Sequence, residues 1–218
     1  MHFFKYSRAL AARTGCAPEA VLKTTEFAAL MPRLILGERA SAQLVLNLLQ
    51  KRLLEDADIH RAQVPYWDDL IAYQSVFFLS DAAPPPQSAA ERVQFPARAE
   101  SAILLDFQWD LPTVLPLLLR PFTELPIPSR RSLTLLFARS PQGEVTVLRS
   151  TDALKQILTR LSGREDPAQI AAQLNLDPAA MAKAMKRLEE IGAVVAQESF
   201  SASHVGSDLP PSSAVKTA

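Results

Sequence analysis

The chain has 218 residues, 48% of them hydrophobic, and its 23 Lys plus Arg are balanced by 23 Asp plus Glu. This length predicts one or two domains with enough apolar content to bury a core. Zero net charge disfavours nucleic-acid binding, because a duplex-binding domain normally carries a basic excess that neutralises phosphates. The apolar runs are far shorter than a membrane span, so we expect no contact with a membrane.

Residues suited to catalysis or metal binding are few. The single cysteine, Cys16, has no obvious base nearby in sequence, and the three histidines are scattered. The sequence contains no Gly-rich phosphate loop and no nucleophile elbow. We therefore expect no catalytic residue, no metal site and no cofactor in this chain. One cysteine and no apolar signal core at the N-terminus predict a cytoplasmic protein.

The N-terminal part is predicted to be mostly helical. Helices are expected over residues 3–14, from Pro18 or Thr25 onward, over 41–55, and from about 65 to 80. The last of these is unusually aromatic and contains Tyr66, Trp67 and Tyr73. Their rings either fill the core of a helical domain or form a docking surface, since aromatic residues are enriched at the centres of protein interfaces.

Changes in composition divide the chain into four expected parts. In chain order these are a helical domain (1–81), a Pro-rich linker (82–100), a strand plus a C-terminal domain (101–198), and a disordered Ser, Pro and Ala-rich tail (199–218). The C-terminal part opens with a strand at 101–108. A short helix that Pro121 ends is expected to follow this strand.

Residues 133–149 predict a β-hairpin. Its turn is Ser140-Pro141-Gln142-Gly143, in which Pro141 presets φ and Gly143 can take the left-handed conformation of a bulged loop. The flanking strands, 133–139 and 145–149, are rich in large apolar residues. The strand at 101–108 is expected to extend this hairpin to a three-stranded sheet.

Three short helices are expected after the hairpin. A residue at 150–152 can cap the first, while Asp166-Pro167 and Asp177-Pro178 each supply an N-cap and a first-turn proline for the next two. The third helix is expected to end at Gly192. Two strands followed by three helices are typical of a winged helix. The predicted fold class is therefore α+β, with a helical N-terminal domain and a winged-helix C-terminal domain that contains a small antiparallel sheet.

The C-terminal part resembles the PqqD-type peptide-recognition domain, which binds leader peptides in ribosomal peptide natural-product pathways. The segments that carry the resemblance are Leu135-Leu136-Phe137 through Val147-Leu148, Leu154 to Gly163, Ile170-Ala171-Ala172-Gln173-Leu174, and Leu188-Glu189-Glu190-Ile191-Gly192-Ala193-Val194. The resemblance implies that a leader adds as a strand beside the hairpin and packs against the third helix. The backbone contacts would come from Val145, Thr146, Val147, Leu148 and Arg149.

Basic residues of the third helix form a second expected part of the peptide site. Lys183, Lys186 and Arg187 lie three and four residues apart on one face, where they could attract acidic residues of a leader. The alternative is an ordinary solvated helix face.

The whole layout resembles partner proteins of multinuclear non-haem iron oxidases in ribosomal peptide pathways such as those of methanobactin and 3-thiaglutamate. The segment Ile103-Leu104-Leu105-Asp106-Phe107-Gln108-Trp109-Asp110 contributes to this likeness. The resemblance implies a heterodimer in which a separate TIM-barrel enzyme holds the iron and oxidises a cysteine of the precursor peptide. Tyr66, Trp67 and Tyr73 are then the candidate enzyme-interface residues.

Two alternatives from other classes remain open. A winged-helix transcription regulator would show the same order of elements. The third helix, which would be its recognition helix, contributes Ala179, Ala180, Ala182 and Ala184, which offer little hydrogen bonding to base edges. The other alternative is an adaptor with no role in peptide processing.

Overall fold

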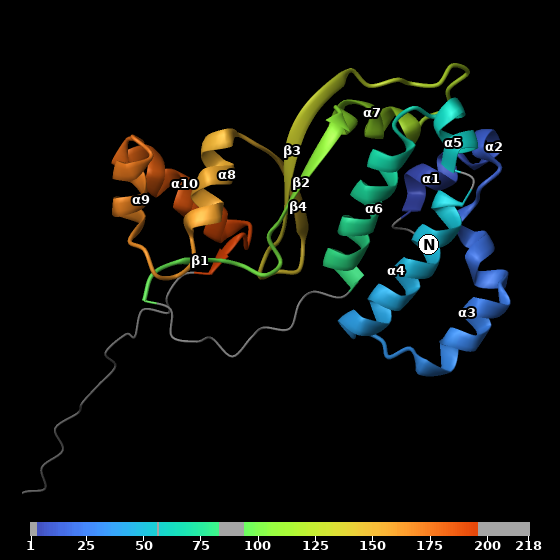
Figure 1. Cartoon of the computed structure of the whole chain (residues 1–218), viewed down its shortest axis with the longest axis horizontal. Helices are drawn as coiled ribbons and strands as arrows, with labels where there is room; N and C mark the ends of the chain where they lie inside the picture. Colours follow the sequence, from blue (N-terminus) through green and yellow to red (C-terminus); the bar gives the residue numbers. More distant parts are fainter. Residues whose placement is uncertain (1–3, 56, 83–93, 196–218) are drawn as a thin grey trace, which may run out of the picture.

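A three-stranded antiparallel sheet lies between two groups of helices (Figure 1). In this computed structural model, residues 4–55, 57–82 and 94–195 are described. The N-terminal helices lie on one side of the sheet and the last three helices on the other. The α+β class expected from the sequence is confirmed.

The N-terminal group is helical, as predicted. It comprises α1 (Lys5–Ala9), α2 (Ala11–Thr14), the 3-10 turn η2 (Pro18–Lys23), α3 (Thr25–Leu30), the 3-10 turn η3 (Met31–Arg33), α4 (Arg39–Leu54), α5 (Ala57–Gln63) and α6 (Trp67–Ala82). The helix expected at residues 3–14 divides into two at Leu10. Those expected at 41–55 and 65–80 correspond to α4 and α6.

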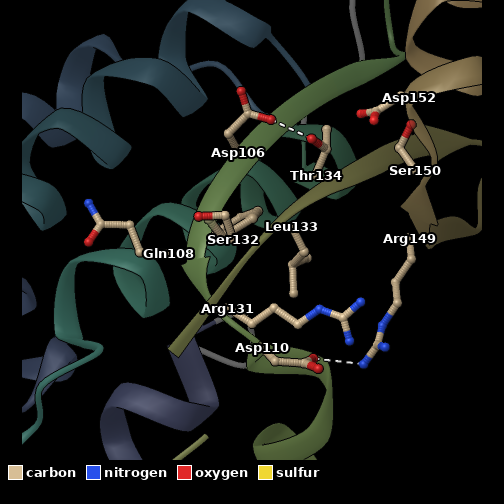
Figure 2. Close-up of a pocket in the computed structure, with 11 residues that line it drawn as sticks. Asp106, Gln108, Asp110, Arg131, Ser132, Leu133, Thr134, Arg149, Ser150 and Asp152 are labelled. Atoms are coloured by element: carbon tan, nitrogen blue, oxygen red, sulfur yellow. Dashed lines mark hydrogen bonds and ion pairs between the residues drawn. The ribbon is translucent and has the colours of Figure 1, made fainter. Parts of the chain in front are cut away.

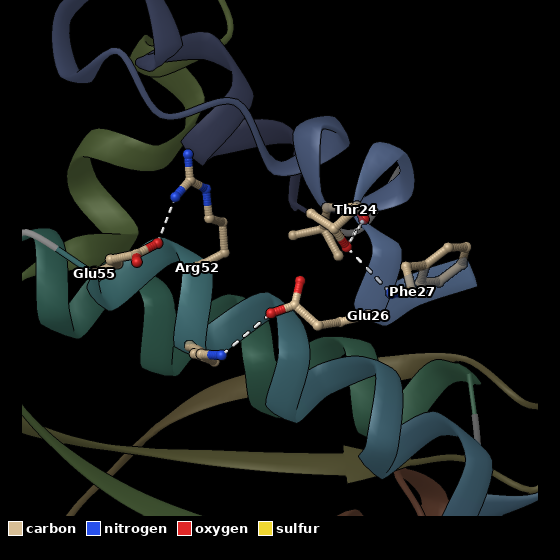
Figure 3. Close-up of polar contacts among 7 residues, drawn as sticks. Thr24, Glu26, Phe27, Arg52 and Glu55 are labelled. Carbon is tan, nitrogen blue, oxygen red and sulfur yellow. Dashed lines mark hydrogen bonds and ion pairs between the residues drawn. The ribbon is translucent and has the colours of Figure 1, made fainter. Parts of the chain in front are cut away.

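A side-chain cap begins α3, and one ion pair joins α3 to α4 (Figure 3). Thr24 caps α3 by accepting a hydrogen bond from the Phe27 N–H at 3.2 Å. The Lys51 ammonium on α4 lies 3.5 Å from the Glu26 carboxylate on α3. Because both charged groups are largely exposed, this ion pair contributes little to stability.

The second half of the chain supplies the strands and the remaining helices. These are β1 (Ala97–Arg98), β2 (Ile103–Trp109), α7 (Leu111–Leu118), β3 (Arg130–Arg139), β4 (Val145–Ser150), α8 (Asp152–Arg160), α9 (Pro167–Gln173), α10 (Pro178–Glu190) and β5 (Val194–Val195). The main sheet has the order β2-β3-β4. The predicted strand at 101–108 therefore joins the hairpin, as expected.

The predicted turn and caps are confirmed by the local geometry. Gly143 has φ +91°, and the Ser140 N–H donates to the Glu144 carbonyl at 2.8 Å. Thr151, Asp166 and Asp177 each accept a backbone hydrogen bond at the start of α8, α9 and α10 respectively.

The second half of strand β3 is buried on both faces and contributes to two cores. Leu135 and Phe137 point toward the N-terminal helices, whereas Leu136 and Ala138 point toward α8, α9 and α10. Side chains alternate across a strand, so one strand can fill both cores. The N-terminal helices consequently share their core with the sheet, and the expected boundary at 82–100 does not divide the protein into two separately packed parts.

The expectation of a linker over residues 82–100 is wrong for the last of these residues. Ala97 and Arg98 form β1 and pair with β5, and the Ala99 N–H donates to the Ala193 carbonyl at 2.9 Å. The apolar run after α10 provides this pairing partner, a tertiary contact that local composition did not reveal. Residues 83–93 and the expected tail at 199–218 lie outside the described residues.

Candidate functional site

Strand β4 is an edge strand. Its paired neighbour is β3, in a register that places Leu148 opposite Leu136 and Val147 opposite Phe137. Within residues 4–55, 57–82 and 94–195, no strand pairs with the other side of β4. An unpaired edge presents a row of backbone donors and acceptors to which an extended peptide can add.

The hairpin hydrogen bonds indicate which β4 residues face that open edge. Ser140 and Glu144 are hydrogen-bonded across the turn, and such pairs alternate with non-bonded pairs along an antiparallel ladder. Thr146, Leu148 and Ser150 therefore bond to β3. Val145, Val147 and Arg149 instead direct their N–H and C=O groups outward. Thus three of the five expected backbone-contact residues face the open edge.

The side chains of β4 alternate between the two sides of the sheet. Val147 packs against the core shared with the N-terminal helices, and Leu148 packs against the core beneath α8, α9 and α10. Both are only partly buried. The next residue, Arg149, lies on the same side as Val147 and is exposed.

Arg149 is anchored by a buried carboxylate. Its guanidinium lies 2.7 Å from Asp110 Oδ1, and the Asp110 side chain is 7% exposed whereas that of Arg149 is 53% exposed. Asp110 stands between β2 and α7, so this ion pair ties the open edge of the sheet to the start of that helix. Sequence reasoning missed it because the two residues lie 39 positions apart.

A pocket of about 580 Å³ opens beside this ion pair (Figure 2). It lies between the end of β2, the start of β3 and the end of β4, with the first residue of α8 at its rim. Its charged and hydroxyl-bearing side chains are Asp106, Asp110, Arg131, Ser132, Thr134, Arg149, Ser150 and Asp152. The pocket therefore suits a polar or charged ligand group.

Asp106, which lines the pocket, has two side-chain partners of its own. It accepts a hydrogen bond from the Thr134 hydroxyl, and its carboxylate lies 3.1 Å from the Lys155 ammonium. These two contacts, the Thr134 hydrogen bond foremost, hold the pKa of the Asp106 carboxyl below its ordinary value. Asp106 is therefore ionised, and the Lys155 ammonium compensates its negative charge.

The basic residues predicted on the third helix lie apart from this pocket. Lys183, Lys186 and Arg187 are exposed on α10, and none of them lines the pocket. Arg187 instead pairs with Glu190 one turn later, at 3.1 Å. The arginines that line the pocket, Arg131 and Arg149, belong to strands of the sheet. The sequence pattern did not single out Arg131.

Two of the three expected enzyme-interface residues are core residues. Trp67 is 0% exposed and donates its indole N–H to the Leu53 carbonyl at 2.8 Å, and Tyr66 is 1% exposed with its hydroxyl 2.9 Å from the Pro126 carbonyl oxygen. The docking expectation is therefore wrong for this pair, because neither ring is available to a partner. Tyr73 is partly buried, with its ring centroid 5.3 Å from that of Phe137.

Cys16 is enclosed by the N-terminal helices, and burial raises the pKa of its thiol. In the part of the chain that the structure describes, His, Cys, Asp and Glu form no group of three or more able to hold a metal ion. Among the described helices, none combines the length and apolar character needed to cross a bilayer.

Comparison with known proteins gave no match, either to the family models or to the curated proteins.

Proposed function

We propose that this chain is a non-catalytic partner protein that binds the leader of a ribosomally made precursor peptide and presents the cysteine of that peptide to a separate multinuclear non-haem iron oxidase. The observation that carries the proposal is the open edge of β4, where Val145, Val147 and Arg149 direct their backbone groups outward. A leader that adds there would extend the sheet by one strand.

The segment from β3 to α10 is the proposed winged-helix, PqqD-like recognition element. Two features support this assignment: the order of two strands and three helices, and the apolar face that α8, α9 and α10 pack against the sheet. The leader would meet β4 through its backbone and meet both sides of the sheet edge through its alternate side chains.

The proposed mechanism is tethering. Holding the leader raises the effective concentration of the target cysteine at the iron centre of the enzyme, so a weak contact with the rest of the peptide suffices. The partner enzyme, expected to be a cytoplasmic TIM barrel, supplies the iron and the oxidation. This chain supplies peptide recognition and contributes no cofactor.

Exposed apolar side chains around α3 offer a better enzyme-docking surface than the buried aromatic residues. Met31, Ile35 and Leu36 lie in and after η3 and are all exposed, Leu36 completely. Exposed apolar side chains that lie within a few residues of one another are candidates for an interaction site. Under this proposal, Leu36→Asp weakens the enzyme complex without unfolding the chain, because the side chain makes few contacts to lose.

A DNA-binding role has less support. The first turns of α10 expose Ala179, Ala180 and Ala182, whose methyl groups can contact a thymine methyl but cannot hydrogen-bond to base edges. Lys183, Lys186 and Arg187 could contact phosphates, but the overall charge of the chain is zero.

The test is coexpression with a candidate multinuclear non-haem iron oxidase, followed by size-exclusion chromatography with and without a candidate precursor peptide. We expect a stable complex that retains the peptide. Val147→Pro should release the peptide but keep the enzyme, because it removes an outward N–H that β3 does not use. Val147→Thr, which keeps that N–H, is the matched control. Elution of the chain alone, together with salt-sensitive duplex binding, would support a regulator instead.

A further inference from the structure

We propose that the pocket at the end of β4 is a carboxylate-binding subsite in which Arg131 and Arg149 recognise an acidic side chain of the bound peptide. The inference rests on the proposed function for the placement of that peptide along β4. In this proposal, arginines of the sheet recognise the negative charge of the peptide, in place of the basic residues of α10.

The local charge balance favours an anion. Figure 2 shows the Arg131 and Arg149 side chains reaching toward one another from β3 and β4, with Asp110 beside them. Asp110 compensates one guanidinium through its 2.7 Å contact with Arg149. Among the described residues, no hydrogen bond or ion pair involves the Arg131 side chain. At this end of the pocket two guanidinium groups thus face one carboxylate, and the positive charge of Arg131 is left uncompensated.

The other carboxylates of the pocket do not cancel this charge. Asp106 is held by Thr134 and Lys155. Asp152 lies at the opposite rim, next to Ser150, away from the two guanidinium groups (Figure 2). A negative group is thus disfavoured at the α8 rim and favoured near Arg131. Guanidinium groups suit this task because their fixed N–H donors match the geometry of a carboxylate.

The strand register indicates which residue of the peptide reaches the subsite. A residue directly opposite Arg149 in an added strand has its side chain on the same side of the sheet, within reach of the Arg149 side chain. In an antiparallel strand, the residue two positions later lies opposite Val147, which is partly buried against apolar neighbours. The expected motif is therefore an acidic residue, any residue, then an apolar residue.

The experiment uses short synthetic peptides of alternating Thr and Val that carry one Glu, or Gln in its place, two positions before the first Val. Binding is followed by nitrogen-15 NMR through the amides of Val147 and Arg149 and the side-chain Nε signals of Arg131 and Arg149. A half-exposed charge pair contributes up to about 1 kcal/mol, so the Glu peptide should bind up to about fivefold tighter than the Gln peptide.

Arg131→Gln should remove this preference, so that the Glu and Gln peptides bind the variant with equal affinity. Arg164→Gln, which changes an exposed arginine outside the pocket, is the matched control and should keep the preference. Equal binding of both peptides along β4 in the native chain would overturn the subsite and leave the proposed edge-strand function standing.

If neither peptide shifts the β4 amides, edge addition fails, and glutarate then tests the subsite alone. Glutarate-induced shifts of the Arg131 and Arg149 Nε signals that vanish in Arg131→Gln would retain a carboxylate site without the added strand. Unchanged Nε signals would overturn the subsite as well.

Discussion

Gly192 lies directly against the backbone of Arg139: a Cβ at position 192 would stand 2.0 Å from the Arg139 carbonyl oxygen. This approach fastens the end of α10 to the end of β3. The Arg139 guanidinium in turn donates to the Ser80 carbonyl at 2.7 Å and to the Asp81 carbonyl at 2.5 Å, at the end of α6. Arg139 thus connects the helices on both sides of the sheet.

Gly192→Ala should destabilise the protein by roughly 2–4 kcal/mol, because it combines a steric clash with a left-handed backbone at φ +73°. Gly37→Ala is the matched control, since Gly37 has φ +79° with open space where its Cβ would stand. This control should lose only about 1 kcal/mol. The free energy of unfolding from urea denaturation measures both. Equal losses would contradict the close approach.

Trp67→Phe should cost roughly 2 kcal/mol of stability, because it leaves a cavity and removes the hydrogen bond to the Leu53 carbonyl. Tyr73→Phe removes a hydroxyl without a described hydrogen-bond partner and should change stability by less than about 0.5 kcal/mol. Urea denaturation of both variants checks this. An undiminished stability in Trp67→Phe would restore this ring as a candidate docking residue.

The Arg149–Asp110 ion pair should show a coupling energy of about 1 kcal/mol in a double-mutant cycle. The variants are Arg149→Met, Asp110→Asn and the double substitution. Removing Arg149 alone leaves a nearly buried carboxylate without its cation, so this single variant should lose more stability than the double variant. Additive effects of the two substitutions would show that the pair does not couple the sheet edge to α7.

Thr134→Val should raise the pKa of Asp106 toward its ordinary value, since the Thr134 hydrogen bond is the foremost cause of the lowering. A carboxyl with a lowered folded pKa contributes stability above its unfolded pKa and loses it as pH falls through the folded value. The variant should therefore lose less stability on acidification. Carbon-13 NMR titration of Asp106 gives the pKa directly. Lys155→Met, which removes the other partner, is the comparison and should raise the pKa of Asp106 as well.

Alkaline pH should unfold the protein through its tyrosines. Burial raises the pKa of Tyr66 and of Tyr73 to about 12, and it also raises the pKa of Tyr6. The folded state favours the neutral phenols, so stability is intact below pH 10 and falls as pH rises toward 12. Absorbance at 295 nm and far-ultraviolet circular dichroism should change together. Tyrosine ionisation with a midpoint near 10 in a still folded chain would contradict this burial.

The sequence by itself determined the local elements of this protein. The bulged turn at Gly143 and the caps at Thr151, Asp166 and Asp177 were predictable, because their hydrogen bonds join residues only a few positions apart. The apolar patterns of the flanking segments likewise predicted the three-stranded sheet and the last three helices.

Only the tertiary structure decided which faces are buried and which distant side chains meet. It placed Trp67 in the core, joined Arg149 to Asp110, and paired Ala97 with Val195. An aromatic residue has the same periodicity in a core as at an interface, and an ion pair between distant residues leaves no local pattern. These features depend on how the elements pack together.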